Sequence, residues 1–366
     1  MVCHLERKPE HIIDPVEDDN ASLTTPAAKA IKKFTQSTFT FAKRANEKLD
    51  GSALLRQHLS TAPSAIAQRF SHPDVIQMTM ADQAMTAGSD ADSFDLAPDS
   101  PLNREKTRTA HASWVLELEQ KPEFRLLQAF SAQSQVTLEE AIHQLVDLTH
   151  KAALEEEIGN HCWVTACCFL ELAARTAPEQ QIRLVELLLS LRSVVLTDSS
   201  TDAPLAFEDG EGVIWQDLPT FGYTIADEMG SFDGQEKDYT QEEARKWENL
   251  TAFLAQVDAN TSDSPSPLDS SQSWALTAFT WALEGDGSAG GPSELAARLA
   301  CIWMVYDAEK LWSKVLDSQA EQNTLERWNH WREGLLECQS HFGSGTTPKL
   351  IAHALENMQR TQANAS

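Results

Sequence analysis

Four side chains that can bind a metal ion recur along one segment of the sequence: Glu140, His143, Asp147 and His150. Glu140 and His143 form an ExxH pair, which di-iron helical bundles use twice, together with carboxylates from two other helices. The sequence holds no second ExxH pair. On a helix, these four side chains lie opposite an apolar stripe that includes Ile142. We therefore predict a face exposed to water and no metal site.

A second group of metal-ligand side chains consists of His161, Cys162, Cys167 and Cys168. On a helix only His161 and Cys168 share a face, whereas a structural zinc ion needs four converging ligands. We expect reduced thiols buried in the core, as for Cys301, because these cysteines lie in apolar segments and six cysteines are too few for a disulfide scaffold. A nucleophilic cysteine stays open, but it needs a histidine brought from elsewhere in the fold.

The charge and the missing motifs exclude several classes of function. The chain carries 29 basic and 55 acidic residues, a net charge of −26, which opposes binding to nucleic acid. Residues 197–263 hold −13 of this charge, whereas residues 26–59 are the one basic segment of that size, at +5. No Walker loop, GxGxxG, GxSxG, HExxH or paired CxxC is present. We expect no cofactor and no metal, and we favour a role other than catalysis.

The amino-terminal residues and the apolar segments indicate the compartment. Residues 1–17 lack the apolar run of a signal peptide. The most apolar segments, 162–174 and 184–196, are interrupted by charges and fall short of the ~18 residues that span a bilayer. We expect a soluble protein of the cytoplasm or nucleus, neither secreted nor transmembrane.

The hydrophobic pattern is helical over most of the chain, and strand signals are scarce. It predicts an all-α fold, either an irregular multi-helix bundle or stacked helix pairs, with no substantial sheet. Expected helices lie at 138–149, 161–174, 178–196, 241–258, 271–283, 293–316, 324–342 and 349–362.

Two regions are expected along the chain. Residues 1–107 are predicted to be partly disordered, with a basic amphipathic helix at about 26–49 and a linker at about 86–103 that is rich in Ser, Asp, Gly and Pro. Residues 108–364 are predicted to form one helical domain. Seven of the ten tryptophans lie between Trp247 and Trp331, which predicts a rigid aromatic core there.

Three stretches in this domain resemble a known family when taken together. They are WQDLP at 215–219, followed by FGY at 221–223; WENLTAFL at 247–254; and ACIWMVY at 300–306. Over about residues 110–345 their order and spacing are similar to the fungal family catalogued as domain of unknown function 3632. The chain departs from that family's Trp-Asn-Phe at 229–232. The resemblance implies an intracellular, all-helical protein of a filamentous fungus, and it transfers no catalytic residue.

The same stretches place polar side chains close in sequence to tryptophans. An aromatic stripe at helical spacing is typical of a core, but an aromatic cavity with a few polar groups is the usual form of a small-ligand site. The candidate pocket comprises Asp227, Glu228, Trp247, Asn249, Trp303, Tyr306, Lys310 and Trp312.

Three functions stay open on these observations. We favour a non-catalytic interaction or scaffold protein that binds an unknown protein partner. The alternative is a small-molecule binder, or an enzyme accessory to fungal secondary metabolism, that uses the aromatic pocket. A less favoured alternative is a peripheral protein that reaches a membrane surface through the basic helix at 26–49.

Overall fold

The structure is a computed structural model of the 366-residue chain. It describes residues 101–132, 136–198, 200–207, 212–234, 238–261, 268, 274–284, 293–317, 321–343 and 345–364. Contacts divide the chain into two units, Met1–Ser71 and His72–Ser366, and all described residues belong to the second. The basic helix predicted at 26–49 lies outside the described residues, as does the predicted linker up to residue 100.

The described residues form twelve α-helices and one short 3-10 helix. Their only β-structure is two isolated bridges, Thr197 with Pro204 and Ala206 with Val213, so the predicted all-α fold is confirmed. The helices are α5 (Pro101–Leu118), α6 (Pro122–Ser131), α7 (Leu138–Leu154), α8 (Ile158–Arg175), η3 (Pro178–Gln180), α9 (Ile182–Leu191), α10 (Phe221–Gly230), α11 (Gln241–Ala259), α12 (Leu276–Leu283), α13 (Glu294–Tyr306), α14 (Ala308–Asp317), α15 (Glu321–His341) and α16 (Thr346–Asn364).

Local sequence signals explain where several of these helices begin. In α7 and α11 a threonine accepts a hydrogen bond from the backbone of a glutamate three residues later, and that glutamate accepts one in return. These capping boxes satisfy amide groups that have no partner within the helix. At the start of α13, the side chain of Ser293 accepts a hydrogen bond from the amide of Ala296, and no reciprocal bond is formed.

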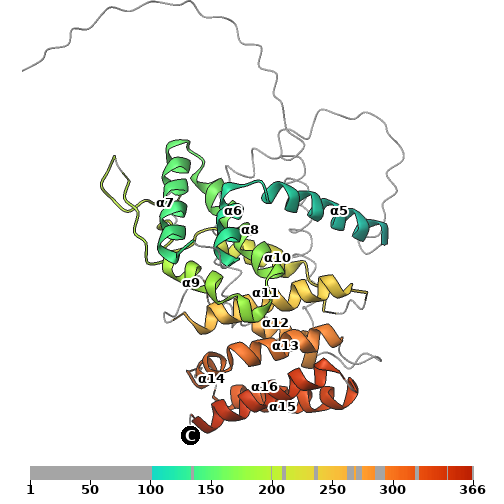
Figure 1. The fold of residues 1–366 in the computed structure, drawn as a ribbon. Helices are drawn as coiled ribbons and strands as arrows, with labels where there is room; N and C mark the ends of the chain where they lie inside the picture. The colour runs from blue at the N-terminus through green and yellow to red at the C-terminus, as the bar shows by residue number, and fades with distance from the viewer. Residues whose placement is uncertain are drawn as a thin grey trace, which may run out of the picture. The chain divides into compact units, whose positions relative to one another are not determined.

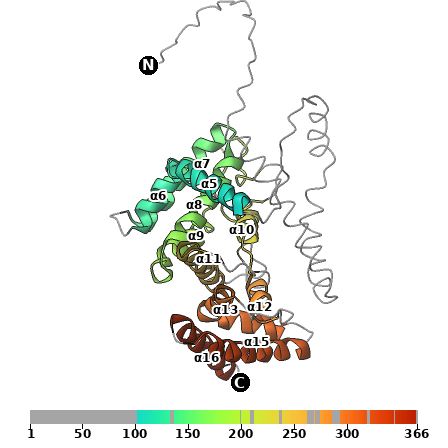
Figure 2. The same cartoon turned by 90° about the vertical axis from the view of Figure 1, so that its right-hand side faces the viewer.

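The helices from α8 onward pack in successive layers. α8 packs on α11, α11 on α13, and α13 on α16, and Figures 1 and 2 show α11, α13 and α16 one below the other. Arg298 of α13 binds both carboxylate oxygens of Glu248 in α11 at 2.6 and 2.8 Å. The same guanidinium donates to Thr346 and Thr347 of α16, so one side chain ties three layers together.

Two of the predicted helices differ from the observed ones. The helix predicted at 293–316 is two helices, because Asp307 has φ −134° and ends α13 before α14 begins. The apolar spacing continues through this break, which is why periodicity alone could not detect it. The helix predicted at 178–196 is the 3-10 turn η3 followed by α9, which stops at Leu191.

The aromatic core predicted in the last third is confirmed. Trp303 and Trp328 are fully buried, and Trp247, Trp312 and Trp331 retain less than a tenth of their exposure. Trp312 and Trp328 meet edge to face with ring centroids 5.0 Å apart, a favourable aromatic geometry. None of the helices in the described part of the chain combines the length and apolar character needed to cross a bilayer.

Candidate functional site

The eight candidate pocket residues fall into three sets of contacts. The first contains Asp227 and Glu228 at the end of α10 and Trp247 of α11. Lys246 lies 2.6 Å from Glu228, 3.3 Å from the Nε2 atom of His111 and 5.4 Å from the ring centroid of Trp247. Burial opposes ionisation of Glu228, but the ammonium of Lys246 outweighs it and lowers the pKa of the carboxyl. The pKa of His111 is lowered by burial and by Lys246.

The second set surrounds Asn249, which joins α11 to the end of α8. Its side chain donates to the carbonyl of Ala174 at 2.9 Å, and its own carbonyl accepts from Gln181 at 2.7 Å. Gln256 donates to Gln181 at 2.9 Å. Asn249 therefore satisfies backbone groups at a helix end, as buried amides commonly do.

The third set lies along α13 and α14 and contains Trp303, Tyr306, Lys310 and Trp312. Trp303 is fully buried, and its indole nitrogen has no hydrogen-bond partner in the described part of the chain. Tyr306 is half-buried, and burial raises the pKa of its phenol. Lys310 binds the carboxylate of Asp258 in α11 at 2.5 Å and the backbone carbonyl of the same residue at 2.9 Å.

A buried acid pair adjoins this third set. Asp258 is fully buried, and Asp307 retains 2% of its exposure. Burial, reinforced by the charge of Asp258, raises the pKa of Asp307 to about 9. Both residues have carboxylate oxygens without a hydrogen-bond partner. Two ionised carboxylates can only accept hydrogen bonds, so they can bond to each other only when Asp307 is protonated. That these three sets of residues line one shared pocket stays a prediction.

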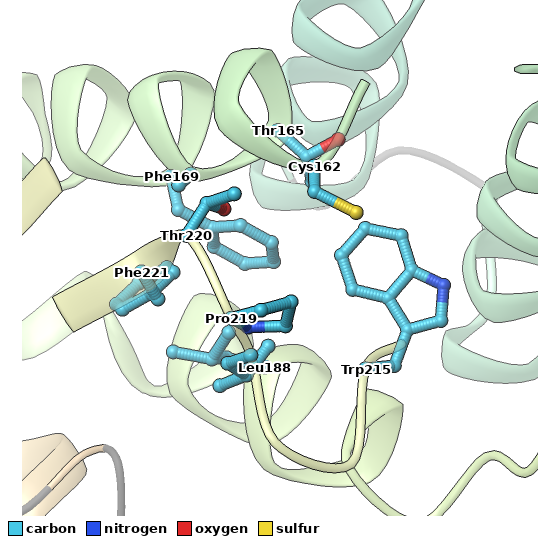
Figure 3. Close-up of a pocket in the computed structure, with 10 residues that line it drawn as sticks. Cys162, Thr165, Phe169, Leu188, Trp215, Pro219, Thr220 and Phe221 are labelled. Carbon is cyan, nitrogen blue, oxygen red and sulfur yellow. The ribbon is translucent and has the colours of Figure 1, made fainter. Parts of the chain in front are cut away.

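A small cavity lies elsewhere, between α8, α9 and the turn that precedes α10. Its volume is about 10 Å³, roughly what one water molecule needs. Figure 3 shows the sulfur of Cys162 directed at the six-membered ring of Trp215, with the indole nitrogen on the far side. Its lining, which includes none of the eight candidates, is Cys162, Thr165, Ala166, Phe169, Leu188, Trp215, Leu218, Pro219, Thr220 and Phe221.

The wall formed by residues 212–220, which we call the Trp215 turn, has an unusual backbone. Trp215 and Leu218 have φ values of 65° and 45°, a left-handed region that costs a bulky residue about 1–3 kcal/mol. Both side chains are buried. Asp217 accepts from the amide of Val213 at 2.7 Å and helps to close the turn. Strain of this size persists only where surrounding contacts enforce it.

A buried hydrogen-bond network holds the Trp215 turn. The indole Nε1 of Trp215 donates to the hydroxyl of Thr149 in α7 at 3.1 Å. The same hydroxyl lies 3.1 Å from Nε2 of His161 in α8, whose Nδ1 lies 2.7 Å from Oε1 of Glu123 in α6. Thr149 also donates to the carbonyl of Leu145 at 2.7 Å. We identify the Trp215 turn, its cavity and this network as the candidate functional site.

The order carboxylate, imidazole, hydroxyl is also the order of a hydrolytic triad. Here, however, the hydroxyl of Thr149 donates to a helix carbonyl and its side chain is fully buried, so no substrate atom reaches it. In this conformation the network positions Trp215.

Sequence reasoning did not connect the members of this network. In the sequence, His161 stands in a group of possible metal ligands and Trp215 in a stretch similar to a known family, and neither position points to the other. Glu123 lies in α6, for which no helix was predicted. The available signal was a histidine and a threonine at apolar helix positions, because buried polar side chains require partners.

The other chemistry-bearing residues lie as follows. Glu140, His143, Asp147 and His150 are all exposed, so the predicted solvent-facing stripe of α7 is confirmed. Cys162, Cys168 and Cys301 are buried, Cys167 is half-buried, and all four are free thiols. Burial raises the pKa of Cys167 to about 12, which leaves it without thiolate character at neutral pH. In the ranges that the structure describes, no three His, Cys, Asp or Glu side chains are grouped to hold a metal ion.

Comparison with known proteins gives a family and no assigned activity. Neither a curated protein nor a solved structure matches this chain. Residues 167–335 match the family described as "Protein of unknown function (DUF3632)". The match begins within α8 and ends within α15, so it includes the Trp215 turn and the α11–α13 layers. Residues 167–335, less than half of the chain, are therefore similar to this family of unknown function.

Proposed function

We propose that the protein is a non-catalytic interaction or scaffold protein that acts in the cytoplasm or nucleus. The observation that carries this proposal is the succession of packed layers α8, α11, α13 and α16 (Figures 1 and 2). Proteins built from stacked helices present long lateral surfaces, on which partners bind.

The contacts between layers support such a role, because a binding surface gains affinity when it is rigid before the partner arrives. Arg298 joins three layers, as described above. Arg327 of α15 binds both oxygens of Glu284, the residue after α12, at 2.6 and 2.8 Å. Trp331 donates to the same carboxylate at 2.7 Å.

The outer face of α15 offers apolar side chains for contact. Leu325 and Leu336 are 45% and 51% exposed. They are eleven residues apart, about three helical turns, and therefore lie on the same side of the helix. We propose this pair as part of the partner-binding surface.

Affinity purification of the full chain from its native cells tests the proposal. We expect a defined protein to co-purify in near-stoichiometric amount with the wild type and to be lost from the double variant Leu325→Glu/Leu336→Glu. Leu154→Glu is the matched control, because Leu154 is 84% exposed at the end of α7. Recovery of the monomer alone, together with turnover of a substrate, would contradict a scaffold role.

A second candidate function is small-molecule binding, which the cavity beneath the strained Trp215 turn supports. An apolar molecule that displaced the turn would contact Phe169 and Leu188. This function includes an accessory role in fungal secondary metabolism. Metabolite profiling of a deletion strain and thermal-shift measurements with apolar compounds test it. An unchanged profile with no ligand-dependent rise in Tm would overturn it.

A further inference from the structure

The Trp215 turn is a strained segment whose tryptophan makes one hydrogen bond to the helices beneath it. Arg192, at the end of α9, also donates to the carbonyl of Gln216 in this turn at 3.3 Å. Trp215 and Leu218 both have left-handed backbones and both line the cavity. The indole of Trp215 has one hydrogen-bond donor, and it is given to Thr149. Loss of this contact removes one of the interactions that enforce the strained backbone, and therefore favours relaxation of the turn.

The hydroxyl of Thr149 joins three contacts of the network. It lies 2.7 Å from the carbonyl of Leu145 and 3.1 Å from Nε2 of His161, and it accepts from the indole of Trp215. Its oxygen has two acceptor positions, and Trp215 fills one of them. The carbonyl and the imidazole ring together fix the hydroxyl that holds the indole.

The other ring nitrogen of His161 faces Glu123 at 2.7 Å. Burial opposes ionisation of Glu123, but the hydrogen bond from His161 outweighs it and lowers the pKa of the carboxyl. An ionised Glu123 is an acceptor only, so Nδ1 of His161 carries a hydrogen and donates to it. Glu123, His161, Thr149 and Trp215 thus form one continuous chain of buried hydrogen bonds.

The charged surroundings of this pair come from a few elements. From the α6 end, Lys121 acts on Glu123 through space. From α8, the thiol of Cys168 lies close enough to Glu123 that the charge of the carboxylate adds to burial in raising the pKa of the thiol. α7 contributes the uncharged Thr149, and the carboxylate of the Trp215 turn, Asp217, is bound to the amide of Val213. Among the described residues, Glu123 is the one charged group in contact with the ring of His161.

We propose that the hydrogen bond between Glu123 and His161 is a latch that holds the Trp215 turn closed, and that loss of this bond releases the turn and opens the cavity. The carboxylate fixes the imidazole ring, the ring fixes the hydroxyl of Thr149, and the hydroxyl holds the indole. Release uncovers Cys162, whose sulfur lies beside the six-membered ring of Trp215 (Figure 3). The latch is independent of the scaffold role proposed above.

Alkylation of Cys162 by N-ethylmaleimide, followed by peptide mass spectrometry on the full chain, tests the latch. Trp215→Phe removes the indole N–H and keeps an aromatic ring, and Glu123→Gln removes the charge and keeps the shape. In both variants we expect Cys162 to react about tenfold faster or more, because a charge-assisted network is lost. Labelling of Cys301 and Cys338, which lie in α13 and α15, stays at the wild-type rate.

Trp331→Phe is the matched control, because it also removes one indole hydrogen bond, to Glu284, but in the α12–α15 layer. It leaves the reactivity of Cys162 unchanged. Unchanged Cys162 labelling in folded Trp215→Phe and Glu123→Gln would overturn the latch, as would equal acceleration of all buried cysteines.

Discussion

The ammonium of Lys310 lies 2.5 Å from Oδ1 of Asp258, whose side chain is fully buried. The two residues connect α14 to the end of α11, where Lys310 also donates to the carbonyls of Asp258 and Thr261. A cation at the carboxyl end of a helix is also favoured by the helix dipole. Lys310 thus stabilises a junction between layers, whether or not it contacts a ligand.

Replacement of Lys310 leaves a buried carboxylate with a weaker partner. We expect Lys310→Met to lower the free energy of unfolding by about 3 kcal/mol, the lower end for a broken buried pair, because Lys314 remains 3.8 Å from Asp258. Urea denaturation measures the change. Lys151→Met is the control, since Lys151 and Glu155 are exposed and 4.0 Å apart, and it should cost less than about 0.5 kcal/mol. Equal effects of the two substitutions would refute this role of Lys310.

Asp307 makes stability depend on pH in a defined direction. Its folded-state pKa of about 9 lies above its ordinary value of 3.8, so between these values the folded state holds a proton that the unfolded state has lost. Stability therefore falls as pH rises from about 4 to 9, by up to about 1.4 kcal/mol per pH unit. Asp307→Asn removes this contribution.

Urea denaturation of Asp307→Asn and wild type at pH 5.5, 7.0 and 8.5 measures the effect. We expect the variant to gain stability relative to the wild type at each step toward alkaline pH. If the unfolding free energies of wild type and Asp307→Asn changed with pH in the same way, Asp307 would be ionised in the folded protein.

Gly234 is required by a close approach of Trp281. A Cβ atom at residue 234 would lie 2.5 Å from Cγ of Trp281 and 2.7 Å from its Cβ, and this Cβ cannot move unless the helix moves with it. We expect Gly234→Ala to cost about 1–3 kcal/mol, measured by thermal unfolding. Gly222→Ala in α10 meets nothing within 4 Å and should stabilise by about 0.5–1 kcal/mol, because alanine is the better helix former. A neutral Gly234→Ala would show that Trp281 can repack.

α5 is attached to the other helices by exposed and half-buried contacts. Arg108 binds both oxygens of Glu243 at 2.7 and 3.1 Å, and Trp114 stacks on Trp163 with centroids 5.3 Å apart. We expect Arg108→Ala to change the free energy of unfolding by less than about 1 kcal/mol while it accelerates amide hydrogen exchange in residues 101–118. Trp114→Ala should accelerate the same exchange further, because it also loses aromatic burial. Unchanged exchange in both variants would mean that other contacts hold α5.

The sequence by itself determined the helical class, most of the long helices and the buried aromatic character of the last third. These features follow from apolar spacing and capping residues, which act within a few turns of one chain segment. The solvent-facing stripe of α7 was predictable for the same reason. The helices α5, α6 and α10 were not predicted. α6 and α10 are short, and few turns carry little periodic signal, whereas the apolar residues of α5 do not gather on one face.

Only the tertiary structure decided which polar side chains meet. Glu228, Asn249 and Lys310 are near tryptophans in sequence, yet each binds partners from a different helix junction. Glu123 and His161 are 38 residues apart and form one buried pair. Periodicity fixes the face on which a residue lies, but the packing of separate helices fixes what that face touches, and a buried charge persists only where this packing supplies a partner.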